Sequence, residues 1–495
     1  MGIVRNQSIK STFSFYFGMM IGAINTVIVY PNVFKETPEH FGLIQILVSY
    51  AVVIATITTF GMPKAFVRFF PAIKDKGQLY FLSLIVPLIG FVLAVISYYL
   101  FKSQIFELLN ASQLLRDNFF YIILLIFFIG FYDVLTAISR AFFSTAIPIF
   151  INEVFLKLYI LSILILHWLG YIDFSTFLQV YILGYLLKFL ILFIIELKNK
   201  YFDFSLSVTN LNIKEIINFG LFVLAGGASI IIVARLDMMM IASLLDLEQV
   251  AFYAVAFYIG NAIKIPARAI TSISTPLIAN AWEKQDLRLI QNLYYKTSIN
   301  QLILGGVFFL CIWLSIDDIF SLLPLKFQGG KWVVFFIGLS QLFNITTGIN
   351  GVIIINSSYY RYDFITNLIL LLFTFIANYI FIPSDWHILG ISISGINGAA
   401  LATALSIFLF NIIRLFVIKI KMDMQPFDTK TIYVVILLIL IFLSIKFIPF
   451  TEIPILNIGL RSLAVLILFF PMLFIFNLSE DITRLINDIK KNIIS

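Results

Sequence analysis

The chain has 495 residues, of which 61% are hydrophobic and 12% charged, and its mean hydropathy is +1.03. A soluble domain is nearer half apolar and a quarter charged, so this composition excludes a soluble enzyme, a disordered protein and a nucleic-acid-binding domain. Long unbroken apolar runs also argue against an outer-membrane barrel, whose strands alternate apolar and polar residues. The composition therefore predicts an all-α polytopic membrane protein, and the net charge of +7 bears on its topology.

Apolar runs bounded by charges, proline or asparagine predict about fourteen transmembrane helices, since about 20 apolar residues are needed to cross the bilayer core. Pro266 interrupts the eighth run, and Gln341, Asn344 and Asn350 interrupt the tenth. The connecting loops are too short to form a soluble domain. The expected spans cover about residues 11–31, 42–62, 79–101, 118–140, 147–169, 174–196, 213–235, 250–272, 295–316, 332–355, 363–383, 397–419, 432–449 and 457–477.

The basic residues predict which side of the membrane each loop occupies. An even number of spans puts both termini on one side, and 23 of the 33 Lys and Arg then lie in segments on that side, against eight on the other. Because Lys and Arg mark the cytoplasmic face, the N- and C-termini are expected to be cytoplasmic. The last residues, 478–495, place Ile482, Leu485, Ile486 and Ile489 at helical spacing, which predicts an amphipathic tail on the membrane surface.

Two segments half a chain apart resemble each other weakly. One runs from Phe41-Gly42-Leu43 to Phe70-Pro71, and the other from Phe252-Tyr253-Ala254 to Thr275-Pro276. Six spans followed by six are typical of a transporter with two parallel lobes, although chance produces such echoes in any polytopic protein. We therefore expect an N-terminal lobe with spans one to six at 1–205, a C-terminal lobe with spans seven to twelve at 206–421, and the last two spans with the tail at 422–495.

Ionisable side chains fall within the expected spans, where a charge near the bilayer centre costs about 2.5–3.5 kcal/mol. One interpretation is purely structural. Lys and Arg at the cytoplasmic ends of the spans reach the lipid headgroups, and Glu153 forms an ion pair with Lys157, four residues later. The functional interpretation is a cationic, water-filled cavity open to the cytoplasm between two lobes, which suits a phosphate-bearing substrate. Its candidate substrate-binding residues are Arg140, Lys157, Lys188, Lys264 and Arg268, and the acidic candidates for ion coupling or a structural pair are Asp133 and Glu153.

Uncharged polar residues form a second set within the spans. Such side chains more often bond neighbouring helices than ligands, but a few could meet sugar hydroxyls or a coupling cation. The candidates for a polar cavity lining are Asn25, Asn261, Asn300, Gln341 and Asn344. The single cysteine, Cys311, and three widely separated histidines predict neither a disulfide nor a metal site, and no cofactor is expected.

Three stretches of the sequence together resemble one known family. They are MGIVRNQSIKSTFSFYFGMMIGAINTVIV at the N-terminus, FGLIQILVSYAVVIATITTFGMPKAFVRFFP across the second span, and ARLDMMMIASLLDLEQVAFYAVAFYIGNAIKIPARAITSISTPLIA at the start of the second lobe. With fourteen spans and short loops, the chain resembles the Wzx-type O-antigen and capsular polysaccharide flippases. The superfamily also contains the MurJ lipid II flippases and the MATE exporters.

This resemblance implies two six-helix lobes around a central cavity, with two further helices appended. It implies alternating-access export of an undecaprenyl-diphosphate-linked oligosaccharide across the bacterial inner membrane, for lipopolysaccharide O-antigen or capsule assembly. The implied partners are that lipid-linked oligosaccharide, membrane lipid, a coupling cation (H+ or Na+) and polysaccharide assembly proteins. Cationic cavity residues are a feature of the family, and no signature residue identifies the sugar.

Other functions stay open at this point. A lipid II flippase has the same fold and a diphosphate substrate, so charge does not separate it from an oligosaccharide flippase. A drug-cation exporter of this fold would favour an acidic cavity. A membrane-embedded polysaccharide polymerase, ligase or glycosyltransferase would need catalytic groups on a sizeable outer loop, which this chain lacks, so no enzyme is expected. The intramembrane charges argue against a scaffold without transport.

Overall fold

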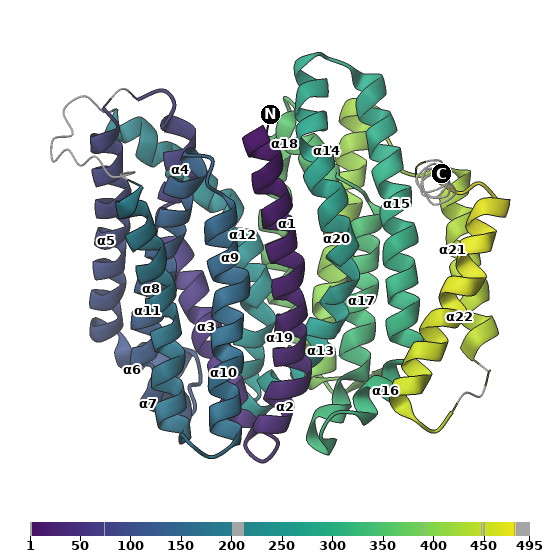
Figure 1. Ribbon diagram of the computed structural model, residues 1–495, viewed down its shortest axis with the longest axis horizontal. Helices are drawn as coiled ribbons and strands as arrows, with labels where there is room; N and C mark the ends of the chain where they lie inside the picture. The colour runs from purple at the N-terminus through teal and green to yellow at the C-terminus, as the bar shows by residue number, and fades with distance from the viewer. Residues whose placement is uncertain are drawn as a thin grey trace. The chain divides into compact units, whose positions relative to one another are not determined.

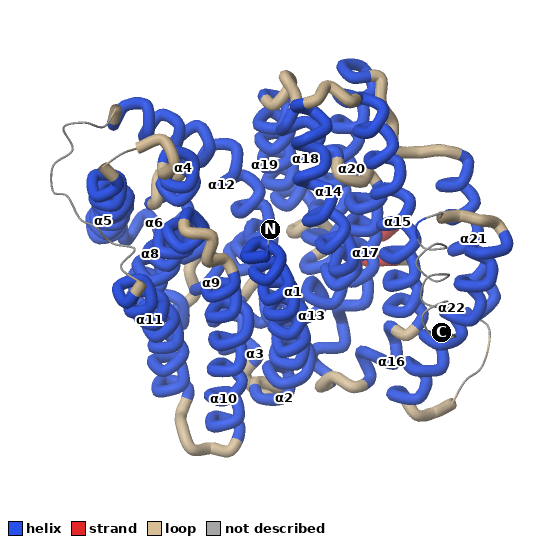
Figure 2. The backbone as a smooth tube through the Cα atoms, turned by 45° about the horizontal axis from the view of Figure 1, so that its top comes forward, coloured by secondary structure: helices blue, strands red, loops and turns tan. Residues whose placement is uncertain are grey.

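The structure of the chain is a computed structural model that describes residues 2–73, 75–199, 212–388, 390–446, 448, 451–479 and 481. Among these residues the regular secondary structure is helical except for one short antiparallel hairpin, of strands β1 (Trp386–Ile388) and β2 (Ile391–Ile393) (Figures 1 and 2). The chain divides into two compact units, residues 1–254 and 255–495, and the division falls within helix α13 (Leu247–Asn261).

The first unit is built from long helices joined by short connections, and two of its spans contain π-helical segments. Its elements before α13 are α1 (Gly2–Ala23), the π-helical segment η1 (Ile24–Val29), α2 (Tyr30–Val33), α3 (Pro38–Thr58), α4 (Met62–Phe69), α5 (Lys76–Leu100), α6 (Lys102–Leu108), α7 (Gln113–Asn118), α8 (Phe120–Ala141), α9 (Ala146–Phe150), the π-helical segment η2 (Ile151–Phe155), α10 (Leu156–Trp168), α11 (Phe174–Lys198) and α12 (Ile213–Leu244).

The second unit contains 3₁₀ segments beside its long helices. Its elements after α13 are the 3₁₀ segment η3 (Ala262–Lys264), α14 (Ile265–Glu283), α15 (Leu287–Leu314), α16 (Ile316–Ser321), the 3₁₀ segment η4 (Leu325–Gly330), α17 (Lys331–Thr346), α18 (Asn350–Asn356), α19 (Arg361–Phe381), the hairpin, α20 (Gly395–Met422), α21 (Thr429–Lys446) and α22 (Pro454–Ile475).

The number of spans agrees with the sequence. Among the described residues thirteen helices are long and apolar enough to cross a membrane, and the bent pair Leu325–Thr346 and Asn350–Asn356 makes a fourteenth. The predicted all-α polytopic fold is thereby confirmed. Two expected ends were wrong: the seventh span runs to Leu244 and not to about 235, and the eighth runs to Glu283 and not to about 272. The seventh was ended too early at the charges Arg235 and Asp237, because Asp237 is buried and accepts a hydrogen bond from Tyr253, so the helix continues past them.

Helix α8 lies at the centre of the first unit, in contact with α3, α4, α5 and α11. Phe66, Tyr80, Val134 and Leu192 are buried in the apolar cluster that joins these helices. The N-cap residue of α11, Asp173, lies outside the span, and hydrogen bonds from Thr176 hold the pKa of its carboxyl below the usual value.

Helix α12, expected to begin the second lobe, packs on α3 and α4 in the first unit. The lobe and tail boundaries at 205/206 and 421/422 stay a prediction.

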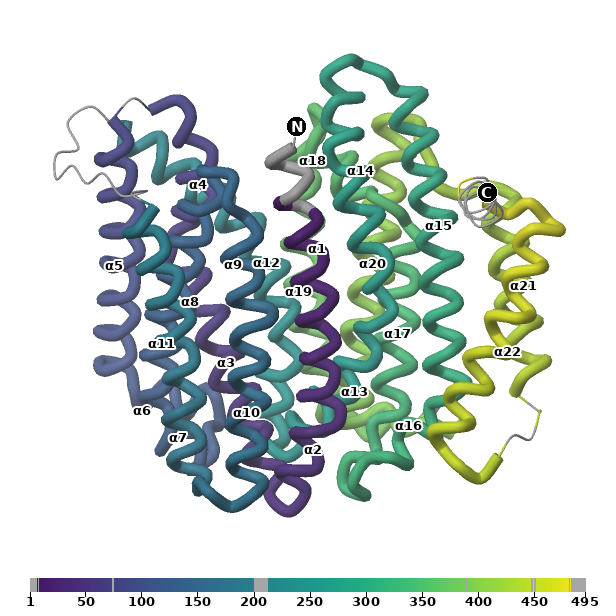
Figure 3. The backbone as a smooth tube through the Cα atoms, in the orientation of Figure 1, coloured from purple at the N-terminus to yellow at the C-terminus, as the bar shows by residue number. Residues whose placement is uncertain are grey.

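In the second unit the last two spans pack against α15, as the yellow end of the chain shows in Figure 3. Leu302, Leu310, Leu438 and Phe469 are buried in the apolar cluster between α15, α21 and α22. The other faces of α21 and α22 carry exposed apolar side chains, as expected where the solvent is lipid. Examples are Ile432, Ile436, Leu440, Leu463 and Ile467. This arrangement supports the expectation that the last pair faces lipid, which stays a prediction.

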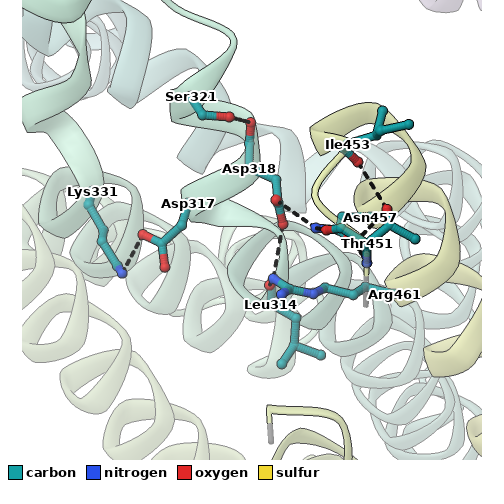
Figure 4. A network of polar contacts seen from close by, with 9 residues as sticks. All are labelled: Leu314, Asp317, Asp318, Ser321, Lys331, Thr451, Ile453, Asn457 and Arg461. Carbon is teal, nitrogen blue, oxygen red and sulfur yellow. Dashed lines mark hydrogen bonds and ion pairs between the residues drawn. The ribbon is translucent and has the colours of Figure 1, made fainter. Parts of the chain in front are cut away.

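A polar network also fastens α22 to the end of α15 (Figure 4). Asp318 of α16 accepts a hydrogen bond from Asn457 Nδ2 at 3.0 Å and pairs with Arg461 at 3.0 Å. Arg461 also donates to the carbonyl oxygen of Leu314, and Asn457 holds the backbone of Thr451 just before α22. Polar and apolar contacts together therefore make the last span an integral part of the second unit.

The tenth span is broken into two helical parts, which end in α17 and α18 and meet at an angle of 48°. Gly348 between them has φ +68°, a conformation that glycine adopts without strain. Asn411 of α20 bridges the break: its Oδ1 accepts from Thr347 Oγ1 at 2.8 Å and from Asn350 Nδ2 at 3.0 Å, and its Nδ2 donates to Asn344 Oδ1 at 3.0 Å. The asparagines that interrupt this apolar run therefore bond one helix to another. The predicted amphipathic tail at 478–495 lies, from Ile482 onward, outside the described residues.

Candidate functional site

The first unit contains a cavity of about 440 Å³ among four helices. Its walls are the C-terminal part of α3, the start of α4, the second half of α8 and the middle of α12. Lys64, Asp133 and Arg140 are its charged lining residues, and Thr136 and Gly227 also line it. A cavity with three charged side chains inside a bundle of apolar spans is the best candidate for a functional site in the part of the chain that the structure describes.

One face of α8 supplies three of the lining side chains. Asp133, Thr136 and Arg140 are separated by three and seven residues, which are close to whole turns of an α-helix. Asp133 and Arg140 are exposed to the cavity, although both lie within a span. The Thr136 hydroxyl is buried and has no hydrogen-bond partner among the described residues. The face thus offers a carboxylate and a guanidinium to a ligand, whereas the Thr136 hydroxyl lies beneath them.

Lys64 reaches the cavity because the chain turns sharply between α3 and α4. Gly61 adopts φ +70°, and Pro63 lies in the first turn of α4. A Cβ atom at Gly61 would lie 2.1 Å from the carbonyl oxygen of Gly220, so only glycine fits between this turn and α12. A Cβ atom at Gly227 would lie 2.7 Å from Lys64 Nζ. Gly227 of α12 therefore leaves room for the Lys64 ammonium group.

The charges of the cavity are free to bind a ligand. Among the described residues the side chains of Lys64, Asp133 and Arg140 make no hydrogen bond or ion pair. Two cations and one carboxylate give the cavity a formal charge of +1. Charges at the edge of a low-dielectric bundle attract an anion more strongly than charges in open water do. A guanidinium fork and an ammonium in one cavity are well suited to phosphate oxygens.

Two of the predicted substrate contacts, Lys188 and Lys157, do not line this cavity. Both instead contact polar side chains of the first unit. Lys188 is 5% exposed, and its Nζ donates to Asn152 Oδ1 at 2.8 Å and lies 4.2 Å from the centre of the Tyr132 ring. Asn152 donates to Glu153 at 3.0 Å, and Glu153 pairs with Lys157 at 2.7 Å. This chain of contacts supports the structural interpretation of the Glu153–Lys157 spacing.

The π-helical segment η2 carries Asn152 and Glu153 and packs closely on the first span. A Cβ atom at Gly18 would lie 2.3 Å from the carbonyl oxygen of Glu153, so the backbones of α1 and η2 almost touch. Asn25, in the π-helical segment η1, donates to the carbonyl oxygen of Lys157 at 2.9 Å. Asn25 is 4% exposed, and its amide joins two helices and does not line the cavity.

The remaining predicted cations belong to the second unit. Lys264, in η3, donates to Asn261 Oδ1 at 2.7 Å, and Asn261 in turn donates to the carbonyl oxygen of Phe257. Arg268 lies four residues further along, exposed on α14. The first unit's cavity is therefore lined by one of the five predicted cations, Arg140, together with Lys64.

The other polar candidates of the second unit serve packing or a separate cavity. Gln341 is buried in α17, and Asn344 takes part in the Asn411 cluster. Asn300 donates to Asp481 at 3.1 Å at the edge of a cavity of about 820 Å³, whose walls are mostly apolar side chains of α14, α15 and α22. Lys296 also pairs with Asp481, at 3.2 Å, so the charges at this edge are matched.

Two of the three histidines, His40 and His167, lie against the same Phe34 ring and not against cysteine. Among the described residues no group of three or more His, Cys, Asp or Glu side chains is placed to hold a metal ion. His40 stacks on Phe174 with ring centres 3.7 Å apart, and a ring nitrogen of His167 lies 2.8 Å from the carbonyl oxygen of Ile172. These rings therefore contribute to packing at the ends of their helices.

Sequence reasoning missed several charged residues. It ended the second span at about residue 62 and so left Lys64 in the following loop, although the Gly61-Met62-Pro63 sequence there signals a tight turn. It also gave no role to the ion pair between Arg414 of α20 and Asp363 of α19. Opposite charges at the same-side ends of two consecutive spans were the available signal. A third omission, the buried Glu196 of α11, had no signal in the sequence.

The fold matches those of several solved membrane proteins. The lipid II flippase MurJ in an inward closed conformation is 16% identical, with a TM-score of 0.70, and the match covers 94% of this chain and 99% of that one. An inward-facing multidrug resistance MATE family transporter of the MOP superfamily is 15% identical, with a TM-score of 0.63 over 83% of this chain and 98% of that one. A MATE transporter of Vibrio cholerae is 12% identical, with a TM-score of 0.53 over 85% and 97%. The predicted superfamily fold is thus confirmed.

No protein with a curated description matches this chain by sequence. Residues 6–282 match the family described as polysaccharide biosynthesis protein, and this range covers more than half of the chain. It includes every residue that lines the cavity of the first unit. The resemblance to polysaccharide flippases is confirmed by this match together with the shared fold. The chain is a multi-pass membrane protein that belongs to the polysaccharide biosynthesis protein family.

Proposed function

We propose that the protein is a flippase that moves an undecaprenyl-diphosphate-linked oligosaccharide across the bacterial inner membrane by alternating access, for O-antigen or capsule assembly. The family and the transporter fold support a flippase and not an enzyme. The observation that carries the substrate class is the cavity of the first unit, in which Arg140 and Lys64 are exposed and have no ion-pair partner among the described residues.

The chemistry of the cavity fits a diphosphate. The Arg140 guanidinium would donate two parallel hydrogen bonds to phosphate oxygens, and Lys64 would add a mobile point charge from the wall formed by α4. Asp133 lowers the net charge, so it limits the affinity and favours release. Release requires that these contacts weaken when the protein changes state, because a ligand held equally in both states shifts no equilibrium.

Arg140→Ala and Lys64→Ala variants test this function. Each is expected to reduce surface polysaccharide by about tenfold or more, because a hydrogen bond to a charged group contributes about 1.5–3 kcal/mol. Charge-retaining Arg140→Lys should be milder, and Lys102→Ala on the exposed helix α6 is the matched control. Surface polysaccharide is measured by immunoblot at equal protein levels in the membrane. Parental export in the Arg140→Ala, Lys64→Ala double variant would rule out the cationic cavity.

The second unit's Lys264 and Arg268 stay predicted contacts of the same substrate, as do Lys157 and Lys188 in the first. Alanine variants at these four positions are read in the same assay. A loss of export from Lys188→Ala with normal membrane insertion would favour a direct role. A loss of folded protein would favour its role in binding Asn152.

The proposed orientation has cytoplasmic termini. Reporter fusions after about residue 75 and residue 425 are expected to report the cytoplasm, and fusions after about residue 110 and residue 390 the periplasm. The reason is the concentration of basic residues on the side of the N-terminus. A reversed signal at any two of these four points would contradict the orientation.

A lipid II flippase is the second candidate, favoured by the similarity in fold to the lipid II flippase MurJ. Both substrates carry a diphosphate, so the cavity charge fits either. Complementation separates them: restored surface polysaccharide in a strain that lacks its oligosaccharide flippase supports the first function. Restored growth in a strain depleted of its lipid II flippase supports the second.

The flippase is also proposed to have further partners. These are polysaccharide assembly proteins and a coupling cation, H+ or Na+.

A further inference from the structure

Glu196 is a fully buried carboxyl group near the end of α11, and the proposed transport mechanism has not used it. Its side chain is 0% exposed. The Ser139 hydroxyl of α8 donates to Oε1 at 2.7 Å, whereas Oε2 has no hydrogen-bond partner among the described residues. A buried carboxyl group with one oxygen unused needs a physical explanation, because most buried polar atoms in native proteins are paired.

The neighbouring charged and titratable groups are engaged elsewhere or exposed. Tyr132, on the same helix as Ser139, donates to the carbonyl oxygen of Pro148, and Lys188, two turns earlier on α11, donates to Asn152. The other elements of the surrounding apolar cluster are α4, α5, α12 and η2. Glu153 of η2 pairs with Lys157, and Asp75, just before α5, accepts a hydrogen bond from Gln78. Lys198 of α11 and Lys214 of α12 are exposed, and Arg140 of α8 lines the cavity.

The remaining groups near this end are also accounted for. Arg68 lies over the Phe219 ring and Lys76 over the Phe70 ring. Tyr80 is buried, and Glu215 contacts Asn212.

An ionised Glu196 would therefore be a buried charge without a counter-charge in the described part of the chain. Such a charge is far more costly than the neutral acid in an apolar environment. One hydrogen bond from Ser139 does not replace the water that a carboxylate binds. The neutral form needs a proton on Oε2, the oxygen that accepts no hydrogen bond, because Oε1 already accepts one from Ser139.

We infer that Glu196 is a proton-binding site that is occupied in this conformation and that couples proton movement to the flippase cycle. The coupling to the flippase cycle rests on the proposed function, whereas proton binding by Glu196 does not. After loss of the proton, the carboxylate is more stable when water hydrates it. Deprotonation therefore favours a state in which the contact between α8 and α11 opens. Ser139 is the residue before Arg140, so the same helix turn carries the proton-dependent contact and the guanidinium of the cavity.

Infrared spectroscopy of the purified full-length protein in lipid nanodiscs tests proton binding without any transport assay. The carbonyl stretch of a protonated carboxylic acid is expected at neutral pH and should disappear in Glu196→Gln. Glu215→Gln, at an exposed carboxylate on α12, is the matched control and should leave the band unchanged. Ser139→Ala removes a donor that favours the carboxylate, so the band should persist to higher pH. A parental spectrum with no such band at neutral pH would overturn the inference, even if the variants do not fold.

Export in cells tests the coupling. Glu196→Gln mimics the protonated state and cannot release a proton, so surface polysaccharide should be lost while the protein remains at its parental level in the membrane. Parental export from Glu196→Gln would overturn the coupling and leave a structural carboxyl. The two proposals fail separately. If Arg140→Ala and Lys64→Ala export normally but the infrared band is present, the cavity function is wrong and the proton site stands.

Discussion

Replacing Arg414 with methionine is expected to lower the free energy of unfolding by about 3 kcal/mol, because it removes a buried guanidinium and leaves Asp363 as a partly buried carboxylate without its partner. The side chains of the pair are 8% and 20% exposed. Arg414 also donates to Asn367 at 3.1 Å and to Thr366 at 3.2 Å, and it lies 4.1 Å from the centre of the Phe410 ring. The measurement is thermal or denaturant unfolding of the purified protein in detergent.

Lys419→Met on the same helix is the matched control for Arg414→Met. Lys419 pairs with Asp423, whose side chain is 89% exposed, and such exposed pairs contribute about 0–1 kcal/mol. The double variant Arg414→Met, Asp363→Asn removes both charges and should recover part of the lost stability. Equal effects of Arg414→Met and Lys419→Met would show that burial does not strengthen the Arg414–Asp363 pair.

Gly42→Ala is expected to have the second large effect, a loss of more than about 4 kcal/mol that prevents accumulation of the folded protein. A Cβ atom at Gly42 would lie 1.7 Å from the carbonyl oxygen of Leu247, so α3 and α13 would have to move apart. Backbone atoms on both sides leave no flexible group to give way.

Gly459→Ala is the matched control for Gly42→Ala. A Cβ atom at Gly459 meets no atom within 4 Å, and this exposed position lies inside α22. Alanine there should be neutral or stabilise by up to about 1 kcal/mol, because it favours the helix. Both variants are compared by their level in the membrane and by thermal unfolding in detergent. Parental levels of Gly42→Ala would mean that the two helices are further apart than the structure has them.

The spans were predictable because apolar run length is a local property. Local spacing also located the pair Glu153–Lys157 and the shared face of Asp133 and Arg140. Contacts over long sequence distances were not predictable. Lys188 is buried by Asn152 and Tyr132, residues 36 and 56 positions earlier in the chain, and nothing near Lys188 indicates them.

Backbone irregularity was a second source of error. The π-helical segments η1 and η2 contain one extra residue per turn, which shifts every later side chain on the helix from the face that a regular helix would give. Lys64 lines the cavity because the chain makes a left-handed turn at Gly61. A count of apolar residues does not detect such a turn. Both effects depend on φ and ψ at single residues, so they appear only in three dimensions.

The broken tenth span has a consequence for how the protein is made. A break inside the membrane frees backbone and amide groups that lipid cannot hydrate. Thr347 and Asn350 have local partners, but they also bond Asn411, more than sixty residues later in the chain. During synthesis α17 and α18 leave the ribosome well before α20. Until α20 is inserted, this segment should therefore remain beside the translocon or in contact with water. The polar contacts of the break are thus completed only when Asn411 arrives with α20.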